Sequence, residues 1–366
     1  MKTTSWLFLA ALAIPVGCDS GSGDSGDTDD GSSSDGPTAG PSTSGPTTDP
    51  STSTTAPTST STTTPTTTAD TDTDTEAGSG DSESGADSSS TGVATQDVTL
   101  QFAGRINGVD AACDTQFMGV GSALSDAQIR DFRLYVSNIR LVDADGEEVA
   151  LELEQDGVWQ YENVALLDFE DGTGLCADTG NADVNSTVVG TVPEGDYTGV
   201  RFDVGVPADL NHTDPNTAEA PLNVLPMTWN WLVGRKFVRF DLLVDNFPAD
   251  NFGWNTHLGS QGCSNSKKPN PMEPPTEDCT RPQRPAIALD AFDLDTNTIV
   301  VDAGALLADV DVSGNVQGAP GCMSFFPADP EMQDNDCADV FPNYGMDWQT
   351  GACVDGCSGQ TFITVE

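Results

Sequence analysis

Hydrophobic and polar residues alternate with a period of two in many short segments of the chain beyond residue 95. In residues 97–106, DVTLQFAGRI, every second side chain would lie on one face, as in a half-buried strand. Residues 132–142 alternate in the same way, and further strand-like segments between turn residues lie at 147–154, 164–171, 197–207, 236–245, 286–292, 297–307 and 360–366. We therefore predict an all-β fold: one sandwich-like antiparallel domain over residues 96–366.

Two local patterns refine this expectation. Residues 143–146, DADG, separate two strand-like segments and predict a hairpin turn. They do not form an EF-hand loop, because the later Gly and the final Glu of that motif are missing at the required spacing. We also expect short helical turns within residues 122–131 and 301–310, which leave the fold class unchanged.

The N-terminus has the pattern of an export signal. Lys2 precedes an apolar stretch over residues 6–14, which is too short to cross a bilayer as a helix. The stretch ends at Val16-Gly17-Cys18 and resembles the lipobox of bacterial lipoproteins, although Pro15 stands where such boxes usually carry Leu. We expect a lipoprotein signal over residues 1–17 and lipid on Cys18; an ordinary cleaved signal is the alternative.

Residues 18–95 are dominated by Ser, Thr, Gly, Asp and Pro and contain almost no large apolar side chain. Such a segment cannot bury enough surface to offset the loss of chain entropy, so we predict a disordered tether. Its mean reach would be on the order of 50 Å, enough to hold a folded domain clear of a lipid surface.

The chain is strongly acidic, with 58 acidic and 13 basic residues and a formal net charge of −45. This charge repels nucleic acid and attracts cations or basic protein surfaces. No basic patch or nucleic-acid-binding motif is present in the sequence. We expect no nucleic-acid partner, and solubility alone is a sufficient reason for the charge as a whole.

Of nine cysteines, eight remain if Cys18 carries lipid. An even number in an exported chain predicts structural disulfides, whereas a thiolate metal cluster would require closely spaced C-x₂-C pairs, which the sequence lacks. Eight cysteines allow 105 connectivities, and short separations favour Cys263–Cys279 and Cys322–Cys337. The eight are Cys113, Cys176, Cys263, Cys279, Cys322, Cys337, Cys353 and Cys357.

The chain has only two histidines, and both lie in compact, loop-like contexts. His212 lies in VPADLNHTDP and His257 in WNTHLGSQGC, and between them MTWNW carries Trp229 and Trp231. Imidazole is the commonest metal ligand among side chains, so both histidines are candidate ligands. The alternatives are a surface or satisfied core role for each histidine and a core role for both tryptophans.

Three motifs together resemble the MbnP family, whose members are also described as four-Cys proteins of a metallo-mystery pair. They are GVPxxLNHxDP, PLNxxxMxWxW and HLGSxGC, and the resemblance extends over nearly all of residues 97–366. The family's usual Gly-Tyr-Lys-Phe is Gly234-Arg235-Lys236-Phe237 here, and this chain has more than four cysteines.

The resemblance implies an exported copper-binding protein that is not itself an enzyme. Its partner would be a diheme cytochrome c peroxidase-like protein of the MauG or MbnH type, which oxidises one tryptophan to kynurenine. Copper would then be held by His212 and His257 with the modified residue, Trp231 or Trp229, of which we slightly favour Trp231. Trp254 is a lower-ranked candidate for the modified residue. Met227 and Met323 could each supply a thioether ligand, and the alternative for both is a packing role in the core.

Two other functions stay open at this point. A surface adhesion or glycan-binding β-domain on a stalk would present exposed aromatic side chains in a groove, with Trp159 the first candidate. An envelope protein that binds zinc would use the same two histidines. In each case we expect a bacterial cell-envelope protein, lipid-anchored and either periplasmic or at the cell surface.

The anchor can be tested directly. Cys18→Ala should release the folded domain from the membrane fraction into the soluble fraction, because it removes the residue that carries lipid. Immunoblots of fractionated cells measure this, with Ser20→Ala as the matched control. Unchanged membrane partitioning of Cys18→Ala would contradict the prediction.

Overall fold

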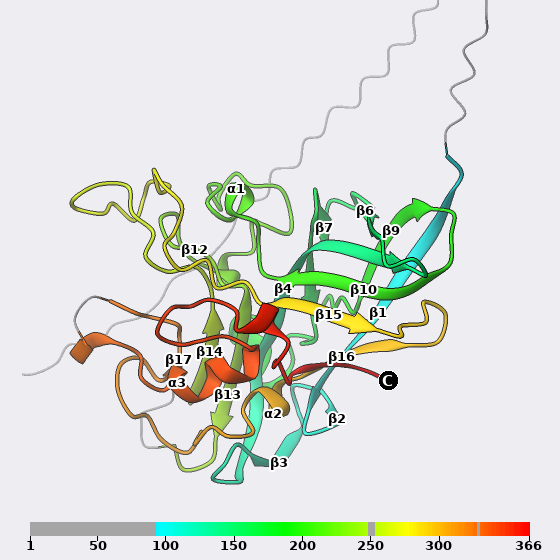
Figure 1. Cartoon of the computed structure of the whole chain (residues 1–366). Helices are drawn as coiled ribbons and strands as arrows, with labels where there is room; N and C mark the ends of the chain where they lie inside the picture. The colour runs from blue at the N-terminus through cyan, green and yellow to red at the C-terminus, as the bar shows by residue number, and fades with distance from the viewer. Residues whose placement is uncertain (1–92, 248–252, 328–329) are drawn as a thin grey trace, which may run out of the picture. The chain divides into compact units, whose positions relative to one another are not determined.

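The computed structural model describes residues 93–247, 253–327 and 330–366 (Figure 1). The predicted signal, Cys18 and the predicted tether up to residue 92 lie outside the described residues. The first strand, β1 (Thr95–Ile106), begins one residue before the domain boundary that we expected. None of the helices in the described part has the length and apolar character needed to cross a bilayer.

The larger of two main sheets is built around one long strand, β4 (Ser125–Asp143). Its main path runs in the order β15 (Ala286–Asp290), β10 (Tyr197–Val204), β4, β13 (Val238–Val244), β14 (Trp254–Leu258) and β17 (Gly321–Cys322). Also paired in this sheet, directly with β4 or through β8, are β3 (Gln116–Val120), β5 (Glu148–Ala150), β7 (Gln160–Tyr161) and β8 (Val164–Asp168).

The smaller sheet has the order β18 (Ile363–Val365), β16 (Thr298–Asp302), β1, β9 (Thr187–Pro193) and β6 (Glu152–Leu153), with β2 (Val109–Asp110) also paired to β1. A separate ribbon joins β11 (Thr228–Asn230) to β12 (Gly234–Arg235). The short helical elements are α1 (Ala208–Asn211), α2 (Ala303–Leu306), α3 (Cys337–Val340) and the 3₁₀ turns Gly174–Asp178, Leu225–Met227, Pro330–Met332, Phe341–Tyr344 and Asp355–Cys357.

The two main sheets share one hydrophobic core. Phe102 of β1 meets Phe202 of β10 edge to face, with ring centroids 6.0 Å apart. Gly104 of β1 lies so close to Phe169 that a Cβ there would come within 2.5 Å of the ring. The predicted all-β class is therefore confirmed. The pairing is mostly antiparallel as expected, but β1 pairs with β16, and β14 with β17, in parallel.

Local expectations had mixed outcomes. The hairpin is confirmed, since β4 pairs with β5 and the Asp143 carboxylate accepts from the backbone N–H of Asp145 and Glu147. A helical turn also forms at α2, where Asp302 accepts from two N–H groups of the first turn. The helical turn expected in residues 122–131 is wrong, because β4 starts at Ser125 and its Ala127 and Ile129 alternate into the core.

All eight cysteines beyond Cys18 are paired, which confirms the disulfide prediction. Both pairs favoured by short separation are present, Cys263–Cys279 and Cys322–Cys337. The other two disulfides are Cys113–Cys176 and Cys353–Cys357. Cys322–Cys337 joins β17 to α3, whereas the other three bridges link segments that lie outside the strands.

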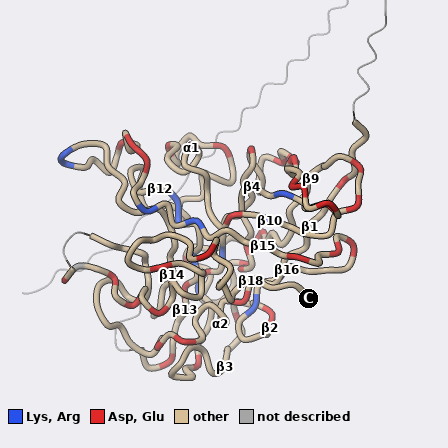
Figure 2. The backbone as a smooth tube through the Cα atoms, viewed as in Figure 1, with Lys and Arg blue, Asp and Glu red and all other residues tan. Residues whose placement is uncertain are grey.

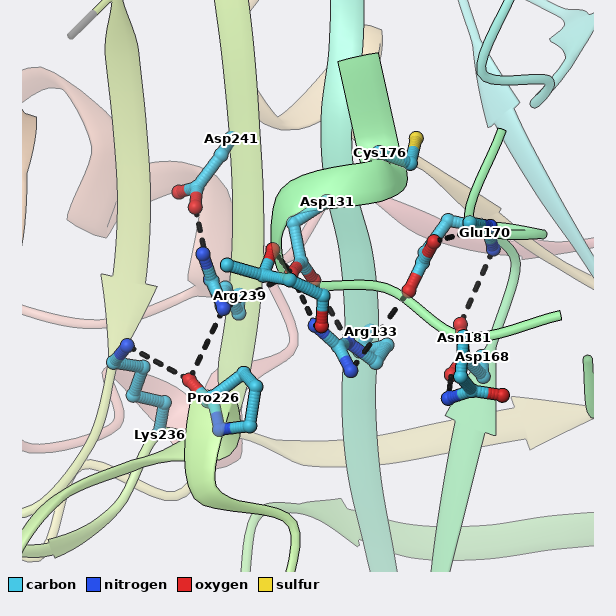
Figure 3. A network of polar contacts seen from close by, with 12 residues as sticks. Asp131, Arg133, Asp168, Glu170, Cys176, Asn181, Pro226, Lys236, Arg239 and Asp241 are labelled. Atoms are coloured by element: carbon cyan, nitrogen blue, oxygen red, sulfur yellow. Dashed lines mark hydrogen bonds and ion pairs between the residues drawn. The ribbon is translucent and has the colours of Figure 1, made fainter. Parts of the chain in front are cut away.

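A buried network of charges links β4 to β13 (Figure 3). Arg133 binds Asp131 on its own strand, and Arg239 binds Asp241 on its own strand with Nε 2.8 Å from Oδ2. Arg239 also reaches across to Asp131, with Nη1 3.0 Å from Oδ2. In the strand register, Arg133 lies opposite Arg239, and Asp131 lies opposite Asp241. Like charges therefore face each other directly, and the ion pairs along each strand and diagonally between the strands compensate the buried charges.

Several of the few basic side chains of the chain are thus buried inside the domain. Arg133, Arg235, Arg239 and Arg281 are all buried, whereas Lys267 and Lys268 are exposed. Acidic residues are spread over the loops (Figure 2). The surface is therefore poorer in cations than the composition alone indicates.

Asp168 lies beside this network and gives it a pH dependence. Burial raises the pKa of Asp168 to about 8, against the opposing attraction of Arg133. The folded chain therefore holds this proton more tightly than the unfolded chain. The resulting stabilisation is complete below the unfolded pKa of about 4 and is lost as pH rises through about 8.

Asp168→Asn should remove this contribution, because the amide stays neutral at every pH. When the pH is raised from about 5 to about 8, the free energy of unfolding of the variant should increase relative to that of the parent by on the order of 2–4 kcal/mol. Urea unfolding at both pH values measures the difference, with the exposed Asp114→Asn as control. An equal pH dependence in parent and variant would show that Asp168 is ionised in the fold.

Candidate metal centre

His257 lies on β14 in a buried pair with Asp241 of β13. Its Nε2 is 2.7 Å from Asp241 Oδ1. Although burial opposes ionisation, His257 and Arg239 hold the pKa of Asp241 well below its usual range. The ionised carboxylate only accepts hydrogen bonds, so Nε2–H is the donor, and Nδ1 is the nitrogen that would offer a lone pair to a metal. That Nδ1 is buried and has no hydrogen-bond partner among the described residues.

His212 follows α1 and has the opposite tautomer. Its Nδ1 is 3.4 Å from the backbone oxygen of Trp231, which can only accept. The lone pair is then on Nε2, which lies 3.2 Å from Asn211 Nδ2 and 3.3 Å from Cys279 Sγ. Burial lowers the pKa of His212, which favours the neutral, ligating form of the ring.

Each histidine has a different tryptophan as its neighbour. The Trp229 ring is tilted against His257, with centroids 6.3 Å apart, and it also contacts Phe325 at 5.7 Å. The Trp231 indole N–H donates to the backbone oxygen of His212 at 2.6 Å. Both tryptophans are half-buried. The segment from Trp229 to Trp231 therefore touches one histidine at each end.

Two glycines let this segment approach its neighbours. A Cβ on Gly259 would come within 2.4 Å of the Trp229 ring. Gly234 has φ +89°, and a Cβ there would come within 2.5 Å of the Asn211 side chain. Asn211 in turn accepts from the backbone N–H of Arg235 at 2.8 Å, which fixes the loop before His212 to β12.

Arg235 is a positioning residue whose role the sequence did not reveal. Its side chain is 1% exposed, and its guanidinium donates to four backbone carbonyls around the His212 loop. The acceptors are Leu210, Asn211, Thr213 and Leu222. The only signal in the sequence is an arginine where the resembling family carries tyrosine. A guanidinium suits this position because it has five donors in a rigid fork.

The other sequence candidates are packed into the domain. Trp254 is fully buried, and its indole N–H donates to Thr256 Oγ1 at 3.1 Å. Met227 is also fully buried in the core, and Met323 is half-buried. Trp159 is half-buried and packs against the core. Trp254 and Met227 therefore have sufficient structural roles.

The described part of the chain contains two groups of three residues that could hold a metal ion. Within each group, the three potential ligand atoms lie within 4.8 Å of one another. One is His212, Cys263 and Cys279, and the other is Cys113, Glu170 and Cys176. The cysteines of both groups are disulfide-bonded, and neither group contains both histidines. A shared site for His212 and His257 stays a prediction.

Comparison with known proteins identifies the family. The family model described as MbnP matches residues 95–324. Among solved structures, MbnP from Methylosinus trichosporium is similar with a TM-score of 0.63 and 31% sequence identity, covering 75% of this chain and 99% of that one. No curated protein matches the chain. The matched residues contain both histidines and the MTWNW segment, and the chain belongs to the MbnP family.

Proposed function

We propose that this protein binds copper through His212 and His257. The observation that carries the proposal is the buried Nδ1 of His257, which has no hydrogen-bond partner in the described part of the chain while Nε2–H is fixed by the Asp241 carboxylate. A carboxylate that orients a ligating imidazole in this way is the usual arrangement around metal-bound histidines. Two neutral imidazoles suit copper, and the paired cysteines offer no thiolate to compete with them.

The third donor in this proposal is a tryptophan oxidised to kynurenine by a diheme partner of the MauG or MbnH type. An intact indole has only a donor N–H, whereas the opened ring has a ketone and an aryl amine that can approach a metal. The contacts favour Trp229, because its ring lies against His257 while the Trp231 N–H is engaged with the His212 carbonyl. The sequence alone slightly favoured Trp231.

Export to the cell envelope and a lipid anchor at Cys18 complete the proposed function. In this setting the protein is a binding protein and the substrate of its partner, with no catalytic residues of its own. The adhesion alternative has less support, because Trp159 packs against the core instead of standing free in a groove.

The histidine site predicts a graded loss of copper affinity. His212→Ala and His257→Ala should each abolish tight Cu(I) binding, since each removes one ligand. Asp241→Asn should weaken binding by about 10–100-fold, because it leaves the ligand in place but loosens its orientation. Competition with a chromophoric Cu(I) chelator measures the affinities.

Asp245→Asn, an exposed carboxylate that follows the same strand, is the matched control and should bind as the parent does. Circular dichroism verifies that each variant is folded. Parent affinity in both histidine variants would place the copper site elsewhere, and a zinc preference of the parent would favour the zinc alternative.

The oxidised tryptophan predicts a dependence on the partner. Protein co-expressed with the diheme partner should contain kynurenine in the MTWNW peptide and bind copper more tightly than protein expressed alone. Trp229→Phe should lose both effects, whereas Trp231→Phe should keep the modification. Because the surface is acidic, high salt should slow the modification if the partner docks through a basic face.

Peptide mass spectrometry with fragmentation identifies the modified residue. Kynurenine at Trp231 would restore the assignment favoured by the sequence. An unmodified MTWNW peptide in co-expressed, copper-loaded protein would contradict the oxidation step and leave binding by two histidines.

A further inference from the structure

The loop between β14 and β15 is closed by a disulfide that touches His212. Cys263 and Cys279 form the bridge, and Cys279 Sγ lies 3.3 Å from the Nε2 atom that carries the His212 lone pair. The ligand atoms of the three residues all lie within 4.8 Å of one another. Reducing one bond would thus place two thiols and an imidazole nitrogen in a single group.

This bridge is also the one among the four in which neither cysteine is buried. Cys263 and Cys279 are both half-exposed, whereas each of the other three disulfides has at least one buried cysteine. Exposed disulfides are the ones that exchange with external thiols most readily, since exchange requires attack on a sulfur atom. A dithiol is therefore expected to reduce Cys263–Cys279 before the other three.

A cavity of about 670 Å³ opens directly onto the group. His212 and Cys279 line it, together with the acidic side chains of Asp209, Glu277 and Asp278 and one cation, Arg284. The lining is acidic overall, so it favours entry of a metal cation over that of an anion.

We propose that reduction of the Cys263–Cys279 disulfide creates a second, thiol-dependent Cu(I) site formed by His212 Nε2 and the two cysteine sulfurs. A dithiol donor supplies two electrons and two protons, the S–S bond breaks to give two thiols, and the donor becomes a disulfide. Each thiol releases its proton when it binds the metal as thiolate. Thiolate and imidazole ligands together suit Cu(I).

This inference rests on the proposed function only through His212, which both sites use. With the disulfide intact, the sulfurs are bonded to each other and His212 is available to the site that includes His257. With the disulfide reduced, two thiolates compete for the same copper. The redox state of one bridge would then decide which ligands hold the metal.

The test uses His257→Ala, in which the site with two histidines is disabled. The full-length variant is reduced briefly with a phosphine, freed of reductant without oxygen, and titrated with Cu(I) against a chromophoric chelator. We expect no tight binding before reduction and one Cu(I) per chain after it, with thiolate-to-copper absorption in the near ultraviolet. Alkylation and peptide mapping should find Cys263 and Cys279 labelled first.

Three controls define the site in this background. Adding His212→Ala should weaken the gained binding, and adding Cys263→Ser with Cys279→Ser should abolish it. Adding Cys353→Ser with Cys357→Ser, which removes another short-range disulfide, should leave it unchanged. The variant with Cys263→Ser and Cys279→Ser must fold without this disulfide. Alkylation of Cys263 and Cys279 after folding and reduction removes the same two ligands from protein that has already folded with the disulfide in place.

No gain of copper on reduction, first labelling at other cysteines, or copper binding that survives alkylation would each overturn the proposal. Copper binding by the oxidised parent protein reports separately on the site with two histidines. The two proposals can therefore fail independently.

Discussion

The hydrogen bond between Asp241 and His257 connects the core of the domain to its candidate metal centre. The Asp241 carboxylate is buried on β13, where it accepts hydrogen bonds from the imidazole of His257 and the guanidinium of Arg239. Its negative charge is stable there only because these partners replace water. The same contact fixes the histidine tautomer, so the ionisation of one core carboxylate determines which ring nitrogen can act as a ligand.

That constraint extends across the large sheet. Arg239 is shared between Asp241 and Asp131, and Asp131 is in turn bound by Arg133 on the central strand. Removing one member would leave an uncompensated charge in the interior, which is far more costly than losing a surface ion pair. The orientation of His257, the candidate ligand, is thus supported by the arrangement that holds β4 and β13 together.

The sequence predicted those parts of the structure that leave a periodic or local signal. Strands with one buried face, such as β1, alternate in polarity and were expected, as was the hairpin at residues 143–146. All five residues of β14 are buried, but three consecutive ones, 255–257, are polar, so the strand shows neither an apolar run nor a buried face in the sequence, and it was missed although it carries His257. Residues 122–131 resemble a capped turn locally, but pairing within the sheet makes most of them strand.

The candidate site was predictable in its residues but not in its contacts. Motifs identified both histidines and both tryptophans, yet which tryptophan faces which histidine depends on how the ribbon of β11 and β12 folds over β14. The Arg235 contacts were equally hidden, because a backbone carbonyl has no signature in sequence. In the register of β13 and β14, His257 lies opposite Arg239 and diagonal to Asp241, and a single sequence does not specify this register.

The hydrogen bonds from Arg235 to four backbone carbonyls have a consequence for the energetics of the proposed copper site. The His212 loop is ordered when the chain folds, so its entropy is lost before any ion arrives. Binding then does not have to organise the loop, unlike in small metal-dependent domains that fold only around their ion. At the proposed site, the affinity would consequently be set by ligand chemistry and desolvation, and loss of the metal would leave a preorganised loop ready to bind again.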